Sequence, residues 1–137
     1  MTPEAVFSVA NTLALLAWVV LVAFQRRQWA TDYVVLAAVA MFAVAYAGLI
    51  GARWWGSPGG FSSMAAVSAL FSDPWLLLAG WVHYLAFDLL VGRWEARDAV
   101  ARRLSPWLVA PCLVLTFMFG PAGWLSYLAL RRAMARA

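Results

Sequence analysis

The sequence predicts an all-α integral membrane protein built as a four-helix bundle. Of its 137 residues, 66% are hydrophobic and only 12% are charged, and the mean hydropathy is +0.81. Soluble domains have roughly 45–50% apolar and 25% charged residues, so this composition is typical of a membrane protein. Four long apolar segments follow one another without a long polar stretch. We therefore expect a single membrane domain over residues 1–137 that crosses the membrane several times.

The first two predicted spans form a helical hairpin. A spanning helix needs about 20 mostly apolar residues. The first such segment covers about residues 5–24 and follows the helix-start sequence Thr2-Pro3-Glu4. The second covers about residues 32–52 and opens at Thr31-Asp32, where a side chain can cap the helix. Because the connection is short, the two helices are expected to be antiparallel neighbours.

The region after the second span has a different pattern. Trp54 and Trp55 are followed by a stretch rich in glycine, and then by a run of small residues from 62 to 71. Paired tryptophans at the end of a span are typical of the headgroup layer, and ten residues are too few to cross a bilayer. We expect a short interfacial or re-entrant segment here, with an ordered surface loop as the alternative.

Two further spans complete the predicted bundle. The third covers about residues 74–95 and starts with Asp73-Pro74, a pair typical of a helix N-terminus. The fourth covers about residues 106–130 and is interrupted by Gly120-Pro121. Because proline removes a backbone donor, we expect a kink in the fourth helix at this point.

The basic residues lie near the ends of the spans. All ten are arginines, and the formal net charge is +4. They form four separated patches, which suits lipid headgroups and argues against a nucleic-acid partner. If all four segments span, six arginines follow the first and third spans and four lie on the opposite side. The positive-inside rule then predicts that both termini lie outside the cytoplasm.

The third span contains the most informative polar residues. Ionisable groups inside a bilayer cost free energy unless they are neutralised or paired, so His83, Asp88 and Arg93 are candidates for function. On a helix, Asp88 shares a stripe with Tyr84 and Glu95, whereas His83 lies about 140° away from Asp88. A neutral Asp88 could act as an acid, and a charged one paired with Arg93 would be a structural clamp. Both interpretations stay open.

Metal ligation has little support in the sequence. His83 is the only histidine, which excludes two-histidine binding of haem or zinc within one chain. Glu95 and Asp98 resemble a divalent-metal pair, but the neighbouring arginines favour a salt-bridged helix end instead. We therefore expect no metal and no cofactor.

Aromatic residues occur inside the spans as well as at their ends. Inward-facing rings suit a flat, conjugated or isoprenoid ligand, and simple filling of the core is the alternative. The candidate ligand-binding residues are Tyr46, Trp81, Tyr84, Phe87, Phe117 and Asn11.

Two sequence elements together resemble a known family. Asp88, Arg93 and Asp98 form a D-x4-R-x4-D pattern, and Pro121 and Gly123 form a Pro-x-Gly element. Both resemble the small membrane proteins related to the plant abscisic-acid-deficient-four (neoxanthin synthase) protein, whose bacterial members contain a domain of unknown function. The resemblance implies a four-helix membrane domain, and the bacterial members of the family suggest a bacterial inner membrane as the location of this multi-pass protein.

The resemblance also implies a function. The plant relative has a role in converting the epoxy-carotenoid violaxanthin into the allenic neoxanthin. This isomerisation needs an acid for the epoxide oxygen and a base for a polyene proton. By this analogy Asp88 is the acid or base, and Arg93, Asp98 or His83 completes the catalytic set.

Two functions are therefore expected as alternatives. The first is a membrane-embedded isomerase or binding protein for a carotenoid or isoprenoid. The second is a non-catalytic membrane helper or lipid-binding scaffold, in which Asp88, Arg93 and Asp98 form a structural clamp. The expected partners are the lipid bilayer and a carotenoid or isoprenoid ligand, while a homo-oligomer and a partner membrane enzyme stay open.

Overall fold

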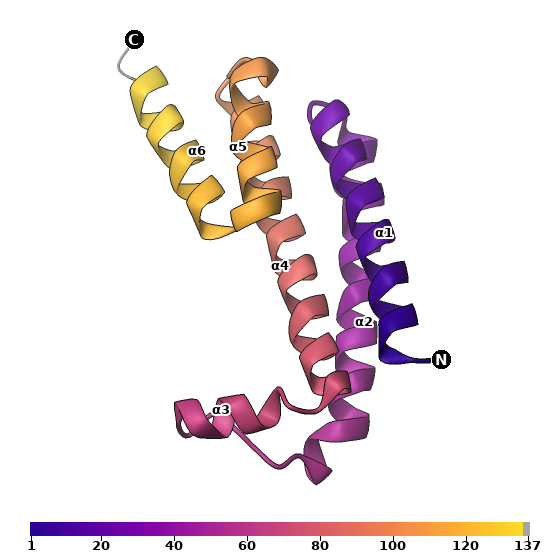
Figure 1. Cartoon of the computed structure of the whole chain (residues 1–137). Coiled ribbons are helices and arrows are strands. Elements are labelled where there is room, and N and C mark those ends of the chain that lie inside the picture. Colours follow the sequence, from indigo (N-terminus) through magenta and orange to yellow (C-terminus); the bar gives the residue numbers. More distant parts are fainter. Residues whose placement is uncertain (136–137) are drawn as a thin grey trace.

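The computed structural model describes residues 1–135, in which every regular element is a helix and none is a strand. Figure 1 shows the arrangement of its six α-helices. They are α1 (Pro3–Ala23), α2 (Val35–Arg53), α3 (Met64–Leu70), α4 (Pro74–Ala101), α5 (Pro106–Phe119) and α6 (Pro121–Met134). A π-helical turn, η1 (Trp29–Val34), precedes α2, and a 3₁₀ turn, η2 (Trp54–Gly56), follows it.

Three helical segments are long and apolar enough to cross a membrane. They are α1, the continuous segment Trp29–Gly56 that contains α2, and α4. The 28 residues of α4 extend about 42 Å, compared with a hydrocarbon core of roughly 30 Å. The three lie side by side in Figure 1, where α4 packs against both α1 and α2. The first three predicted spans are therefore present, as expected of a multi-pass membrane protein.

Local capping explains where two of these helices begin. The Thr2 hydroxyl accepts a hydrogen bond from the Ala5 amide at 3.2 Å. The Asp73 carboxylate accepts one from the Trp75 amide at 2.7 Å, with proline at the next position. These interactions satisfy amides that have no partner within the helix. The helix-start signals predicted for the first and third spans are thus confirmed.

The predicted start of the second span is wrong. Helical structure begins earlier, at Trp29, and Thr31 and Asp32 lie inside the turn η1 rather than at a cap. The Thr31 hydroxyl donates to the carbonyl of Gln28 at 3.3 Å, and Asp32 is engaged by an arginine of α4. A long-range ion pair therefore takes the place of the expected local cap.

The segment between the second and third spans contains the short helix α3. Ser63 caps it by accepting a hydrogen bond from the Ala66 amide at 3.1 Å. In Figure 1, α3 lies across the direction of the long helices, near the end where α2 finishes and α4 begins. This crosswise orientation agrees with the predicted short helical segment, which has seven residues and cannot span.

The predicted fourth span is not a kinked helix, and this corrects the four-helix bundle. The chain reverses at Gly120, so α5 and α6 form an antiparallel hairpin of two 14-residue helices (Figure 1). Gly120 has φ +43°, a conformation that glycine adopts easily, and Pro121 occupies the first turn of α6, where its missing N–H costs nothing. Gly123 then packs directly on Thr116 of α5, with no room for a side chain.

The helix α4 is the centre of the packing. Its residue Gly92 faces the ring of Trp18 on α1 so closely that a Cβ atom would collide with the ring. Trp18 in turn contacts Phe117 of α5, with ring centroids 5.5 Å apart. Leu89 of α4 and Leu113 of α5 are fully buried in the same core. This packing holds α1 and α5 against α4 and positions the polar residues of α4.

Candidate functional site

Two carboxyl groups are buried on one stripe of α4. Asp88 is 8% exposed and Glu95 is fully buried. They are seven residues apart, which places them two turns apart on the same side of the helix. Both lie against the α5–α6 hairpin, through Gly120 and Thr116 respectively. The candidate site is therefore built where the hairpin covers α4.

Asp88 lies beneath the turn of the hairpin. A Cβ atom on Gly120 would stand 2.9 Å from Asp88 Oδ1 and 3.3 Å from Oδ2. Within residues 1–135, Asp88 Oδ2 is buried without a hydrogen-bond partner, and Asp88 makes no ion pair. A buried carboxyl group without a charged partner is a candidate for proton transfer.

Glu95 is the functional candidate that the sequence analysis missed. The hydroxyl of Thr116 lies 2.9 Å from Glu95 Oε1 and 3.1 Å from Oε2, so it donates to one of them at a time. No arginine of the described chain pairs with Glu95. The expectation that Glu95 belongs to a salt-bridged helix end is wrong, because the side chain points into the protein. Its seven-residue spacing from Asp88 was the available signal.

Arg93 is engaged by a residue other than Asp88. Its guanidinium lies 2.7 Å from Asp32 Oδ1, and its Nε donates to the carbonyl of Thr31 at 3.0 Å. Arg97 reaches the second oxygen of Asp32 at 3.2 Å. These interactions join α4 to the turn η1, so Arg93 acts in a clamp with Asp32.

Asp98 forms a second, separate cluster. Its Oδ2 accepts from Arg102 at 2.8 Å and from the hydroxyl of Tyr127 at 2.7 Å, and Arg131 lies 3.5 Å away. Tyr127 and Arg131 belong to α6, so this cluster joins the end of α4 to the end of the hairpin. Asp88, Arg93 and Asp98 therefore do not form one clamp.

His83 lies on another face of α4. It is exposed, stacks on Phe87 with ring centroids 4.4 Å apart, and contacts the ring of Tyr46 on α2 at 5.4 Å. The structure thus brings together three of the predicted site residues, but away from Asp88. The predicted ligand-binding residue Phe117 lies apart from all of these, against Trp18.

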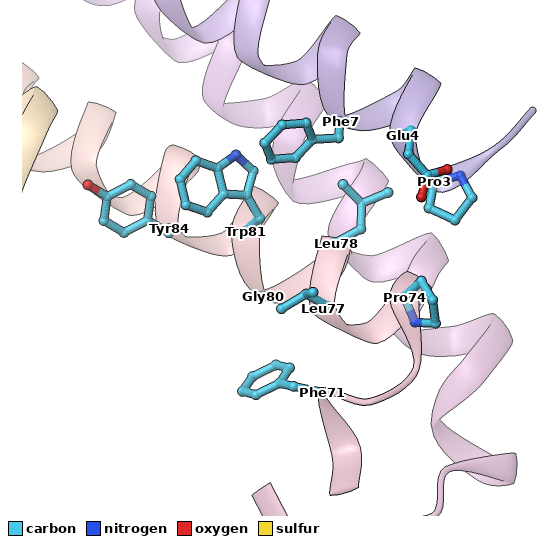
Figure 2. Close-up of a pocket in the computed structure, with 10 residues that line it drawn as sticks. All are labelled: Pro3, Glu4, Phe7, Phe71, Pro74, Leu77, Leu78, Gly80, Trp81 and Tyr84. Carbon is cyan, nitrogen blue, oxygen red and sulfur yellow. The ribbon is translucent and has the colours of Figure 1, made fainter. Parts of the chain in front are cut away.

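An apolar cleft of about 520 Å³ opens between the start of α1, the end of α3 and the first half of α4. Figure 2 shows its walls. The lining residues are Pro3, Glu4, Phe7, Phe71, Pro74, Leu77, Leu78, Gly80, Trp81 and Tyr84.

Aromatic rings and one hydrogen bond shape the end of this cleft that lies toward the middle of α4. Trp81 stacks with Tyr84 at 5.3 Å and approaches Phe7 at 5.6 Å. The indole N–H of Trp81 donates to Asn11 Oδ1 at 2.7 Å. Of the predicted ligand-binding residues, Trp81 and Tyr84 therefore line the cleft, and Asn11 is hydrogen-bonded to Trp81 without lining it.

Tyr84 is the residue of the cleft lining that lies nearest along α4 to the buried Asp88. Its hydroxyl points away from Trp81 in Figure 2, in the direction of the following turns of the helix. Asp88 lies one turn further along and on the same side of α4. The arrangement can hold a flat apolar molecule in the cleft, with the acid Asp88 one helical turn beyond Tyr84 and outside the lining. Among residues 1–135, no group of three or more histidine, cysteine or acidic side chains could hold a metal ion.

The fold and the site define a class of protein: a small, helical, multi-pass membrane protein with an apolar cleft along the first half of α4 and two buried acids, neither in an ion pair, further along the same helix. The family model ABA4-like (ABA DEFICIENT 4-like) matches residues 5–127. The chain therefore belongs to this family, which is linked to neoxanthin synthesis. Comparison with curated proteins and with solved structures found no match. The resemblance based on Asp88, Arg93, Asp98 and the Pro-x-Gly element is confirmed at the level of the family.

Proposed function

We propose that this protein binds a carotenoid or a related isoprenoid in the membrane and isomerises it by acid–base chemistry at Asp88. The observation that supports this most directly is the buried Asp88 carboxyl, which has no ion-pair partner in the described chain and an oxygen without a hydrogen bond. Membership of a family linked to neoxanthin synthesis supports the same substrate class.

The cleft suits one end of such a molecule. Ligand pockets usually have volumes of roughly 300–1,000 Å³ and mostly apolar walls, and this cleft has about 520 Å³. Phe7, Trp81 and Tyr84 offer flat rings against which a cyclic end group can pack. Since the cleft is open, the long polyene chain can extend from it into the bilayer.

The chemistry requires one proton to be given and one to be taken. For an epoxide substrate, the acid protonates the oxygen as its C–O bond breaks, and a base removes a carbon-bound proton as a new C=C bond forms. No electrons are gained or lost, so no redox cofactor is required. A neutral Asp88 supplies the first proton, and the resulting carboxylate can accept the second.

Glu95 is a second buried acid that could take part in this proton transfer. Arg93 and Asp98, expected as partners of Asp88, make their ion pairs with Asp32 and with Arg102, respectively. Glu95 lies on the same stripe of α4 and has only the Thr116 hydroxyl as a partner in the described chain. If Glu95 instead of Asp88 takes the carbon-bound proton, that proton must pass from Glu95 to Asp88 before the next turnover.

A second candidate function is a non-catalytic lipid-binding scaffold. It is favoured by the two clamps at one end of α4, Arg93 with Asp32 and Asp98 with Arg102, which are structural in character. Asp88 itself also lies beside the cleft and does not line it. In this case the cleft holds a lipid, and Asp88 does no chemistry.

The deciding experiment compares the wild type with Asp88→Asn and Asp88→Glu. Each protein is purified in detergent, its bound pigments and lipids are identified by absorbance and mass spectrometry, and it is then incubated with an epoxy-carotenoid. The proposal expects an allenic product of unchanged mass from the wild type, none from Asp88→Asn, and partial recovery with Asp88→Glu. Equal ligand occupancy without product in all three proteins would favour the scaffold.

A further inference from the structure

The α5–α6 hairpin is too short to cross a bilayer. Each of its helices has 14 residues and extends about 21 Å, whereas the hydrocarbon core is roughly 30 Å thick. In Figure 1, α5 leaves from the end of the molecule where α4 finishes, and α6 returns to that end. The end of α4 and the end of α6 therefore lie on one side of a bilayer that α1, α2 and α4 cross.

This path changes the distribution of the arginines. Figure 1 places the α1–η1 connection, the α4–α5 connection and the end of α6 at the same end of the molecule. Eight of the nine arginines in residues 1–135 lie on this side, whereas Arg53 lies at the other end of α2. The eight are Arg26, Arg27, Arg93, Arg97, Arg102, Arg103, Arg131 and Arg132. The count of six against four, which assumed four spans, no longer applies.

Half of these arginines have no acidic partner. Arg93 and Arg97 pair with Asp32, and Arg102 and Arg131 pair with Asp98. The other four are exposed and have no carboxylate within 4 Å in the part of the chain that the structure describes. We call them the basic rim: Arg26, Arg27, Arg103 and Arg132.

Two tryptophans place the basic rim at the level of the headgroups. Trp29 follows Arg27 closely and is 46% exposed, and Trp107 follows Arg103 and is 85% exposed. Exposed tryptophans at the ends of spans prefer the interface between hydrocarbon and water. Trp55 is 90% exposed at the opposite end, where it can occupy the other interface.

We propose that the basic rim binds the phosphate groups of anionic phospholipids in the cytoplasmic leaflet, and that the α5–α6 hairpin is re-entrant from this side. Guanidinium groups bind phosphate with two parallel hydrogen bonds, and the negative surface of the cytoplasmic leaflet attracts clustered arginines. The arginine bias also assigns this side to the cytoplasm. None of the four residues lines the cleft or contacts Asp88, so the proposal is independent of the catalytic one.

Site-directed labelling tests the path of the chain. The lone cysteine is removed by Cys112→Ser, and single cysteines are introduced by Ala101→Cys, Ala135→Cys and Ser62→Cys at exposed positions. A membrane-impermeant maleimide is then applied to right-side-out and to inside-out vesicles that contain the full chain. We expect Ala101→Cys and Ala135→Cys to react only from the cytoplasmic side, and Ser62→Cys only from the other. Reaction of Ala135→Cys on the same side as Ser62→Cys would overturn the re-entrant hairpin.

Lipid retention tests the basic rim. The protein is extracted from vesicles of phosphatidylcholine mixed with phosphatidylglycerol, and the lipids that remain bound are measured by native mass spectrometry. We expect the wild type to retain phosphatidylglycerol with a preference of roughly tenfold or more, weakened by high salt, since each basic residue adds to the attraction.

The matched control for this test is Arg53→Gln, at the opposite end of α2. Combined Arg26→Gln, Arg27→Gln, Arg103→Gln and Arg132→Gln substitutions should remove most of the preference, whereas Arg53→Gln should keep it. Size-exclusion profiles and melting temperatures establish that each variant is folded. A folded four-site variant with the full preference of the wild type would contradict the proposal.

Discussion

The carboxyl group of Asp88 lies against Gly120, close enough that a Cβ atom on the glycine would stand 2.9 Å from Asp88 Oδ1. This contact joins the acid of α4 to the turn between α5 and α6, although the two residues are far apart in the sequence. Without the glycine at this point, the hairpin could not close over the acid. Asp88, from the first sequence element of the family resemblance, therefore lies against the residue that directly precedes the second element, Pro121 and Gly123.

The first prediction concerns this contact. Gly120→Ala should destabilise the protein by about 1–3 kcal/mol, because alanine is strained at φ +43° and its methyl group would collide with Asp88. The measurement is the melting temperature in detergent. Gly48→Ala is the matched control, since a Cβ there meets nothing within 4 Å and alanine favours a helix interior. Equal melting temperatures for both variants would show that the turn tolerates a side chain.

The second prediction separates an acid from a clamp at Asp88. Asp88→Asn should change the stability by less than about 1 kcal/mol, because no ion pair of Asp88 exists in residues 1–135. Removing one partner of a buried ion pair typically costs 3–5 kcal/mol. A loss of that size on thermal unfolding would identify Asp88 as structural. A stable variant that forms no product would support the catalytic role.

The third prediction concerns the buried pair of Glu95 and Thr116. Thr116→Val removes the hydroxyl that donates a hydrogen bond to Glu95. The buried carboxyl is then left without this bond, and the free energy of unfolding should fall by about 1–3 kcal/mol. Thr116→Ser keeps the hydroxyl and is the matched control. If Thr116→Val and Thr116→Ser are equally stable in chemical denaturation, Glu95 must have another partner.

The features that the sequence predicted well are local ones. The side chains of Thr2 and Asp73 accept hydrogen bonds from backbone amides in the same turn. A helix start of this kind can therefore be predicted from a few consecutive residues. The depth of Asp88 in an apolar segment likewise identified a candidate acid, and its burial agrees with that interpretation.

The features that the sequence did not predict depend on tertiary contacts. An interruption by glycine and proline is compatible with a kink or a reversal, and the reversal depends on the packing of Gly123 against Thr116. The same reversal brings Thr116 to Glu95, so the second buried acid could not be recognised without it. Asp32 and Arg93 are likewise 61 residues apart, and no local pattern links them.

The fourth prediction concerns the clamp between α4 and η1. Arg93→Gln should destabilise the protein by about 1–2 kcal/mol, since it removes an ion pair with Asp32 and a hydrogen bond to the carbonyl of Thr31. Product formation per folded molecule should stay unchanged, because this clamp lies apart from Asp88. A folded Arg93→Gln variant without activity would instead support Arg93 as the electrostatic partner of the acid.

The fifth prediction tests the cleft as the ligand site. Leu77 lines the cleft and is 55% exposed, so the larger side chain of Leu77→Trp can fill part of the volume of about 520 Å³ without disturbing the core. The bound polyene or isoprenoid, measured by absorbance and mass spectrometry after purification, should fall at least severalfold. Leu15→Trp is the matched control, because Leu15 is 50% exposed on α1 and does not line the cleft. An equal loss of ligand from both variants would point to a general effect on the surface that faces lipid, and full occupancy in Leu77→Trp would place the ligand elsewhere.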